Sequence, residues 1–466
     1  MFDEYIESKK KDIIKNVCKT VSYPSISVET GNPNIPFGKP CKDVLKYVLS
    51  LGKKLGFRVK NINEYCGYIE FGEGEELVGI IGHLDVVPAD DNWTYSPFKA
   101  KISDGYIYGR GTSDDKGPVI ASLYAMKAVM DTTKVNKRVR LILGLNEEKD
   151  WKCIEHYKLH EELPTIGFSP DADFPCIYAE KGVISIYLIQ QIISKNANVK
   201  IKEIDCNNNA INVVPKICHV LLSINNNIDI KQFISDLKTI IEKYSFEIDI
   251  YKIDDYTIKL TSYGTSSHAA HPDLGINAIS RLVIVLNDIL SLYESNISLF
   301  DLFAKYINTE YTGEGLNINY TDESGSLTLN VGDIQINNDN IQIGMNLRVP
   351  ITIGFSDLID TINSSVFLYD DISVITQDKK DPLYINKDDP LITTLCDIFN
   401  EYTDLKQEPI AIGGATYARA FENCVSFGAN MPGQEDMCHK ADEFIRIDNL
   451  ILSSKIYAKA IYELAK

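Results

Sequence analysis

The sequence predicts an α/β protein in which an open, mostly parallel sheet is built from both ends of the chain and an α+β domain is inserted between them. Two short apolar runs, 77–82 and 139–145, have the continuous hydrophobicity of strands that are buried on both faces. Residues 117–130 lie between them and have the periodicity of a helix. A strand, a helix and a strand in this order are typical of a parallel sheet.

The segments on either side of this unit complete the prediction. Residues 1–23 are rich in Lys, Glu and Asp and carry apolar residues at helical spacing, so we expect a first amphipathic helix there. Beyond residue 182, amphipathic strands alternate with helices, which is typical of an α+β domain. The strands expected there cover 183–193, 257–262, 327–331 and 341–348, and the helices cover 230–244, 278–293 and 355–362. A last helix is expected over 448–464.

Two domains therefore follow from the pattern. A chain of 466 residues exceeds the size of one ordinary core, which favours two or more domains. From about residue 381 the chain returns to helix and Gly-rich loop, so we expect both chain ends to share one domain. That domain would consist of residues 1–182 and 378–466, and the inserted domain of residues 183–377.

The composition excludes several classes of protein. Asp and Glu number 65 against 47 Lys and Arg, and the net charge of −18 repels the phosphate backbone of a nucleic acid. No apolar run approaches the roughly 18 residues of a membrane-spanning helix, and the N-terminal segment lacks the apolar core of a signal peptide. The 10 cysteines are scattered without a CxxC pair, which argues against a zinc ribbon or a disulfide scaffold. We expect a cytoplasmic protein with reduced thiols and no nucleic-acid or membrane partner.

Polar motifs follow the predicted strands, where sites form in open α/β sheets. GHLDVVP, over 82–88, follows the first strand and places His83 and Asp85 on one side of an extended segment. A metal-bound histidine commonly donates its second ring N–H to a carboxylate or carbonyl, and Asp85 is a candidate for that partner. Taken alone, His83 is equally well explained as a histidine satisfied at a strand end.

A second motif, GRGTSDDKG over 109–117, is a Gly-rich loop that leads into the predicted helix. Such a loop can cradle a phosphate, but Asp114 and Asp115 stand where the phosphate would lie and disfavour this interpretation. Carboxylates suit divalent cations instead. A helix start with acidic residues in its first turn explains one of the aspartates, but not the Gly-Arg-Gly approach.

Three further motifs supply acids and a histidine. Glu147 and Glu148 follow the second strand, Asp171 lies in SPDADFP, and His439 lies in MCHKADE. Each alone fits a solvated loop, a turn or a structural histidine. All the motifs together offer two histidines, several carboxylates and no cysteine, a ligand set that suits a pair of Zn²⁺, Mn²⁺ or Co²⁺ ions. Two ions about 3.5–4 Å apart need a bridging carboxylate and a bridging water, whose proton a nearby carboxylate takes.

These motifs resemble the aminoacylase/carboxypeptidase/ArgE–DapE family of di-zinc metallopeptidases. GHLDVVP, GRGTSDDKGP, the NEE triplet and HKADE carry the resemblance. SPDADFPCIYAEKG, INVVP, SSHAAHPDLGINA and PLYINKDDPL are similar to its dipeptidase V branch, which cleaves dipeptides, β-alanyl ones included. The resemblance runs from about residue 80 to about residue 450. It implies a metal-dependent dipeptidase, a hydrolase in which a hydroxide bridging two divalent ions attacks the peptide bond.

The resemblance also implies the metal ligands. His83 and Asp171 would hold one ion, and Glu148 and His439 would hold the other. Asp114 would bridge the two ions. The family uses Zn²⁺ at such a pair of sites, and Mn²⁺ and Co²⁺ suit the same ligands.

Two residues would act beside the ions. Glu147 would be the general base that takes a proton from the bridging water, and Asp85 would orient His83. The peptide bond between Asp114 and Asp115 would be cis, as it is in the family.

The inserted domain resembles the ferredoxin-like lid of the family. By the same resemblance, His268 would stabilise the oxyanion, while Asn212 and Arg348 would bind the polar ends of a small peptide substrate. Gly414 and Thr416 would lie in the loop that lines the substrate pocket. The long insert resembles the monomeric branch, so we expect a monomer.

The sequence departs from the family pattern at two places. The family carries a Gly soon after the two glutamates, whereas this chain has Lys149 and Asp150, so the loop is shaped differently or Asp150 adopts a left-handed conformation. Ala415 replaces the third Gly of the pocket loop, which would narrow the pocket or adjust its specificity. His271 has no family role, and is structural unless it takes the place of His268.

Two other functions use the same residues. An N-acyl amino-acid deacylase or desuccinylase would have the same metal centre but a different substrate. A non-catalytic peptide-binding protein would be expected to have lost a ligand or the base, whereas all five ligand positions and Glu147 are present.

Overall fold

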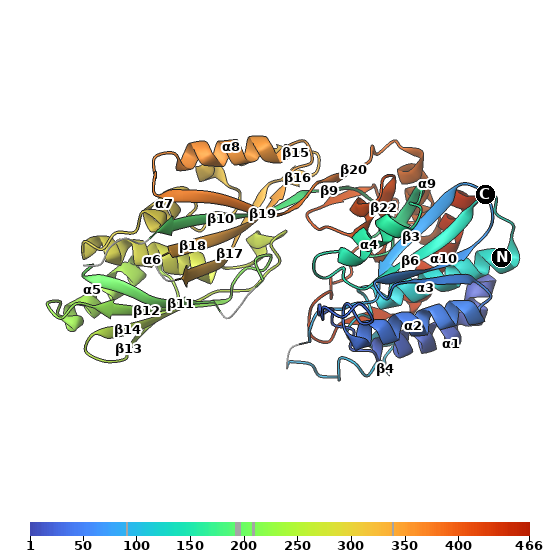
Figure 1. Cartoon of the computed structure of the whole chain (residues 1–466), viewed down its shortest axis with the longest axis horizontal. Coiled ribbons are helices and arrows are strands. Elements are labelled where there is room, and N and C mark those ends of the chain that lie inside the picture. Colours follow the sequence, from blue (N-terminus) through green and yellow to red (C-terminus); the bar gives the residue numbers. More distant parts are fainter. Residues whose placement is uncertain (90–91, 192–196, 207–209, 338–339) are drawn as a thin grey trace. The chain divides into compact units, whose positions relative to one another are not determined.

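The computed structural model describes residues 1–89, 92–191, 197–206, 210–337 and 340–466 (Figure 1). The chain forms two compact units. The first consists of Met1–Tyr178, Tyr384–Ile410 and Thr416–Lys466, and the second of Ala179–Leu383 and Ala411–Ala415. Segments from both ends of the chain therefore build the first unit. The short segment Ala411–Ala415 belongs to the second unit, although it lies far from the rest of that unit in sequence.

The first unit contains most of the predicted open sheet, whose strands β9, β20 and β21 include residues of the second unit, and the α/β fold class is confirmed. Its centre is parallel, because β3 pairs in parallel with β6 and β7, and β7 pairs in parallel with β22. The edge made by β1 and β2 is antiparallel. The strands follow the order β1 (Arg58–Ile62), β2 (Cys66–Phe71), β6 (Arg138–Gly144), β3 (Leu77–His83), β7 (Ile166–Ser169), β22 (Cys424–Ser426), β9 (Ile177–Glu180) and β20 (Leu383–Tyr384), with β21 (Ile410–Ile412) beside β9.

Apolar helices cover this sheet. All of β3 is buried, as its continuous apolar run predicts, and α3 is buried along most of its length. The helix α3 packs against α1 and α10, so the two ends of the chain meet on it. The helices of this unit are α1 (Phe2–Val21), α2 (Lys39–Lys54), α3 (Lys116–Thr132), α4 (Lys152–His160), α9 (Pro390–Thr403) and α10 (Ile447–Ala465). Short strands complete it: β4 (Lys101–Ser103), β5 (Tyr106–Tyr108), β8 (Ala172–Asp173), β23 (Ala429–Asn430) and β24 (Phe444–Arg446).

The second unit is an α+β structure with two antiparallel four-stranded sheets. One sheet has the order β17 (Thr328–Asn337), β18 (Asn340–Val349), β10 (Gly182–Gln191) and β19 (Ile372–Lys380). The other has the order β11 (Val199–Asp205), β12 (Ile217–Ile224), β14 (Thr257–Tyr263) and β13 (Ile248–Lys252). The remaining elements are α5 (Ile230–Tyr244), α6 (Ala278–Leu292), α7 (Ser298–Tyr306), α8 (Phe355–Val366) and the hairpin β15 (Thr321–Asp322) and β16 (Gly325–Ser326).

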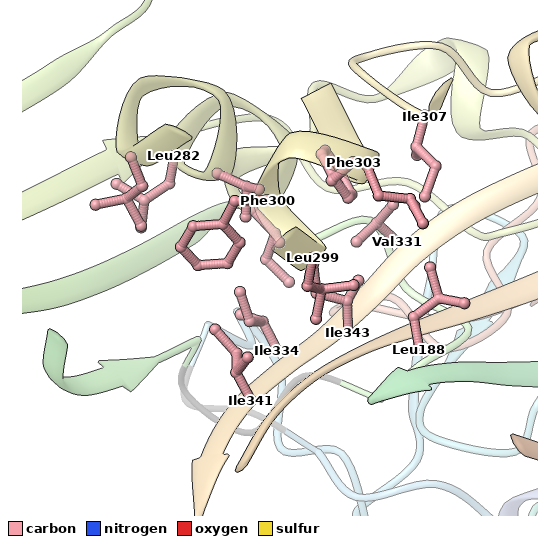
Figure 2. Close-up of a cluster of buried hydrophobic side chains, with 14 of the residues drawn as sticks. Leu188, Leu282, Leu299, Phe300, Phe303, Ile307, Val331, Ile334, Ile341 and Ile343 are labelled. Atoms are coloured by element: carbon pink, nitrogen blue, oxygen red, sulfur yellow. The ribbon is translucent and has the colours of Figure 1, made fainter. Parts of the chain in front are cut away.

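One apolar core joins the elements of the second unit. Figure 2 shows Phe300 and Phe303 of α7 among the side chains of the neighbouring strands, including Ile341 and Ile343 of β18. Alternate residues of β12 are buried, so one face of its sheet turns to the core. The helix α6 contacts strands of both sheets, β12 and β14 from one and β17 from the other.

A buried ion pair interrupts the apolar run of β6. The guanidinium of Arg140 donates from Nε to Glu70 on β2 over 2.7 Å, and both side chains are buried. Arg58 donates to the other oxygen of Glu70 over 3.0 Å. The sequence pattern treats β6 as wholly apolar, whereas its charged residue is satisfied across the sheet.

No helix in the described ranges combines the length and the apolar character that crossing a membrane requires.

The Glu70–Arg140 pair gives a prediction about stability. Glu70→Gln removes the charge of a carboxylate that accepts from two arginines, and we expect the free energy of unfolding to fall by about 1–3 kcal/mol. Urea denaturation of the variant and of the unmodified protein measures this difference. An unchanged midpoint would show that the buried pair contributes no net stability.

Candidate metal centre

The order of the central strands brings the acidic motifs to one edge of the sheet. His83 is the last residue of β3, Glu148 follows the end of β6, and Asp171 follows the end of β7. These three strands are parallel neighbours in the order β6, β3, β7. Residues after the carboxyl ends of adjacent parallel strands share one edge, where open α/β sheets form their sites.

Two groups of potential metal ligands meet at this edge. His83, Asp114 and Asp171 form one group, and Asp114, Glu148 and His439 form the other; within each, the ligand atoms lie within 4.8 Å of one another. Asp114 Oδ1 lies 2.9 Å from Nε2 of His83, and Asp114 Oδ2 lies 3.1 Å from Nε2 of His439. One carboxylate therefore directs a separate oxygen to each group. These are the five residues that the resemblance implies as ligands.

The ring of His83 is held in the form that ligates a metal. Its Nδ1 lies 3.1 Å from the main-chain carbonyl oxygen of Asp85, a distance at which Nδ1–H donates to that oxygen. Burial opposes a charge on the ring, but Asp171 and Asp114 raise the pKa of His83 well above its usual value, so a metal at Nε2 would take the place of a proton. In the neutral ring the proton would reside on Nδ1 and leave the lone pair of Nε2 for that metal. This Nε2 is buried without a hydrogen bond, although it faces oxygens of Asp114 and of Asp171 at 2.9 and 3.5 Å. A lone pair and two carboxylate oxygens that converge in this way fit a cation.

The protonation of the cluster points to the same conclusion. Burial and the charge of Asp114 raise the pKa of Glu148 to about 7 and the pKa of Asp171 to about 6. Burial opposes a charge on His439, yet Glu148 and Asp114 raise its pKa to about 12. Buried carboxylates at these distances repel one another unless positive charge stands between them. Divalent ions would supply that charge, so the residues present fit a pair of ions.

The neighbouring aspartates Asp114 and Asp115 have different partners. The peptide bond between them is cis, as expected. Asp114 faces both groups of ligands, whereas Oδ2 of Asp115 accepts from the main-chain N–H of His83 over 3.0 Å. Asp115 therefore fastens the end of β3 to the start of α3.

Asp85 contacts both histidine and glutamates. Its main-chain oxygen lies next to Nδ1 of His83, as described, whereas the nearest approach of its carboxylate to Nδ1 is 3.5 Å. The carboxylate instead accepts from the main-chain N–H groups of Glu147 and Glu148, each over 3.1 Å. Asp85 thus fixes the peptide that carries the two glutamates.

The loop after the glutamates is shaped by Trp151. This residue, and not Asp150, adopts the left-handed conformation, with φ of 62°, so the expectation for Asp150 is wrong. Its indole Nε1 donates to the main-chain oxygen of Glu147 over 2.9 Å. Its ring packs edge-on against Tyr417, whose ring in turn lies edge-on to His83. The sequence motifs do not single out Trp151. Its one signal in the sequence is the absence of the family Gly, which leaves the left-handed turn to another residue.

The second unit carries four of the residues expected to act on the substrate, Asn212, His268, Arg348 and Gly414. Asn212 and His268 lie on adjacent segments, because the main-chain oxygen of Asn212 accepts from Ala269 and Val213 pairs with His268. Nδ1 of His268 accepts from the N–H of Ala270 over 3.2 Å.

Arg348 lies buried on β18. Its Nη1 donates to the main-chain oxygen of Gly413 over 2.8 Å, and its Nε donates to Asn346 over 3.0 Å. Gly413 and Gly414 belong to the segment of the second unit that Arg348 fastens. Thr416 begins the next segment of the first unit, where its hydroxyl lies 2.7 Å from that of Ser426 on β22.

The sequence is similar to those of known peptidases. The model described as Peptidase family M20/M25/M40 matches residues 79–463. A protein of Bacillus subtilis (strain 168) named "Putative dipeptidase YtjP" is 38% identical over 465 residues, which cover 98% of each chain.

Two solved structures share the fold. Human carnosine dipeptidase 1 has a TM-score of 0.59 at 15% identity, over 100% of this chain and 99% of that chain. The di-peptidase Dug1p from Saccharomyces cerevisiae has a TM-score of 0.60 at 14% identity, over 99% and 98%. The family resemblance read from the motifs is thereby confirmed. Because the family match covers most of the sequence and the bacterial relative aligns over nearly its whole length, the chain belongs to peptidase family M20/M25/M40 and is a hydrolase of the metallopeptidase class.

Proposed function

We propose that the protein is a dipeptidase of the dipeptidase V type, with two divalent ions held by His83, Asp114, Glu148, Asp171 and His439. The observation that carries the proposal is the shared carboxylate of Asp114, which directs one oxygen to each group of ligands. The choice of a dipeptide as substrate is supported by the relative of Bacillus subtilis, whose printed name is that of a dipeptidase and which aligns over 98% of its length.

The ions would supply Lewis acidity, which polarises a peptide carbonyl and lowers the pKa of a bound water from about 15.7 towards about 7. Glu147 is the proposed general base, which accepts the proton of the attacking water and delivers it to the leaving amine. Its support is its position next to Glu148, on a peptide that Asp85 holds by hydrogen bonds and that Trp151 holds from the other side. These hydrogen bonds fix the main chain of Glu147 on both sides, so its carboxylate extends from a backbone with little freedom.

The residues of the second unit are proposed to bind the rest of the substrate. His268 would donate to the oxyanion, Asn212 would bind a polar end, and Arg348 would pair with the terminal carboxylate. The hydrogen bonds from Arg348 to Gly413 and Asn346 support this role, since they fix the plane of the guanidinium. Gly414 and Thr416 are proposed to line the substrate pocket.

Removal and return of metal tests this proposal. We expect that protein stripped with a chelator hydrolyses no free dipeptide, and that Zn²⁺, Mn²⁺ or Co²⁺ restores hydrolysis. Ions that bind only the folded state also raise stability by about 2.7 kcal/mol at 100 times their dissociation constant, so the midpoint of thermal unfolding should rise with added metal. Tripeptides and N-acetyl or N-succinyl amino acids complete the panel of substrates. Release of acetate or succinate without dipeptide cleavage would replace the dipeptidase by a deacylase, and metal-independent cleavage would refute the ion centre.

The two adjacent glutamates provide a matched pair of variants. We expect Glu147→Ala to lower kcat by about 10²–10⁴-fold, because it removes the general base, while metal content stays near that of the unmodified protein. Glu148→Ala should instead lose metal, because it removes a ligand. Metal analysis and steady-state kinetics on both variants separate these roles. Substantial turnover by the Glu147 variant would show that another group takes the proton.

Trp151 gives a prediction about the placement of the base. Trp151→Phe keeps an aromatic ring but loses the donor to Glu147, a bond of about 1 kcal/mol, and we expect kcat to fall about fivefold with KM little changed. The other tryptophan, Trp93, is the control, because its buried Nε1 has no hydrogen-bond partner among the described residues. Trp93→Phe should therefore leave kcat near its original value. Equal kinetics for the two variants would remove any role of Trp151 in placing Glu147.

A further inference from the structure

The Gly-rich loop at residues 109–114 binds an internal anion. Glu443 is fully buried, and its Oε1 accepts from the main-chain N–H groups of Ser113 over 2.8 Å and of Asp114 over 3.2 Å. Its Oε2 accepts from the N–H of Gly111 and from Nη1 of Arg110, each over 2.9 Å. The loop thus forms the kind of N–H cradle that proteins use for phosphate, but the anion is a carboxylate of the same chain.

The main chain reinforces this contact. The N–H of Gly109 donates to the main-chain oxygen of Glu443 over 2.8 Å, and the hydroxyl of Ser113 donates to that of Phe444 over 2.8 Å. Phe444 also begins β24, which pairs with β5 just before the loop. The segment that contains Glu443 is therefore fastened to the loop by side chain and main chain together.

One proposed ligand lies on each side of this contact, Asp114 in the Gly-rich loop and His439 in the segment that carries Glu443. Asp114 follows Ser113 directly, and its own N–H is one of the donors to Glu443. His439 lies four residues before Glu443, in a turn where His439 and Asp442 both have left-handed backbones, with φ of 64° and 56°. Fixing Glu443 in the loop therefore fixes the distance between Asp114 and the segment that presents His439.

We propose that Glu443 is a positioning residue that sets the geometry of the second ligand group, Asp114, Glu148 and His439. This inference rests on the proposed ion centre. In the second group two of three members depend on Glu443, whereas in the group of His83, Asp114 and Asp171 only Asp114 does. The other two members of that first group come directly from the ends of β3 and β7. Loss of the Glu443 contacts should therefore weaken the ion of the second group more than the ion of the first.

The test is a metal titration of Glu443→Gln beside the unmodified protein and a control. The glutamine has nearly the same shape, but its amide N–H₂ faces main-chain N–H donors and cannot accept from them. Glu70→Gln makes the same chemical change at a buried, arginine-bound glutamate of the same unit that contacts neither ligand group in the described structure. Zn²⁺ or Mn²⁺ is titrated by calorimetry against chelator-stripped protein, and thermal unfolding is followed on the same samples.

We expect the unmodified protein and the Glu70 variant to bind two ions with the same affinities. The Glu443 variant should bind the ion of the first ligand group with an affinity within a fewfold of normal. It should bind the ion of the second ligand group about 10–100-fold more weakly. Two ions bound normally by a folded Glu443→Gln, or equal weakening of both ions, would overturn the positioning role. Absence of two ions from the unmodified protein would instead refute the proposed centre itself.

Glu443→Asp provides a second variant that keeps the charge but is one methylene shorter. A shorter carboxylate cannot reach both pairs of donors, so we expect the same selective loss of the second ion from it, with a smaller effect on thermal unfolding than Glu443→Gln has. Normal binding of both ions by this variant would also overturn the inference.

Discussion

Mutual repulsion among buried carboxylates is the constraint on which the centre depends. Asp114, Glu148 and Asp171 are gathered at one edge of a sheet, and in the part of the chain that the structure describes two histidines complete their groups. In a low-dielectric interior this arrangement is unfavourable unless cations intervene. The fold supplies rigidity from the parallel strands, so the acids cannot separate to relieve the repulsion. Affinity for cations at the proposed centre would therefore follow from a sheet that holds the candidate ligands close together.

Hydrogen bonds around the candidate ligands give adjacent acidic residues different roles. In the pair Asp114–Asp115 one carboxylate faces the ligand groups and the other holds the end of β3. In the pair Glu147–Glu148 both main-chain N–H groups bind Asp85, so one side chain can face the ligands while its neighbour is proposed to handle a proton. In each pair of adjacent acidic residues, the two side chains therefore lie in different environments.

Much of this architecture could be predicted from the sequence because its signals are local. The apolar runs of β3 and β6 and the helix α3 between them gave the parallel sheet, and the motifs after the strands gave the candidate ligands. The contacts of Arg140 and of Glu443 could not be predicted, since each depends on a partner far away in the chain. The turn at Trp151 was also missed, because a bulky residue rarely takes a left-handed conformation and only its contacts with Glu147 and Tyr417 compensate. The Gly-rich loop does cradle an anion, but the sequence motif cannot show this, because the anion is the carboxylate of Glu443, more than 300 residues away in the chain.

The proposed ligands lie far apart in the sequence, so the ribosome synthesises them at different times. Four of the five lie between residues 83 and 171, whereas His439 lies more than 260 residues later. During synthesis a ribosome at about 5–20 residues per second needs on the order of 13–54 seconds to cover that interval. Throughout that time a nascent chain contains four of the five proposed ligands but lacks His439, and for most of it the chain also lacks the strand β22 that extends the sheet. An ion bound at that stage would be held by an incomplete form of the proposed centre, and it would be retained or exchanged when the C-terminal segment arrives.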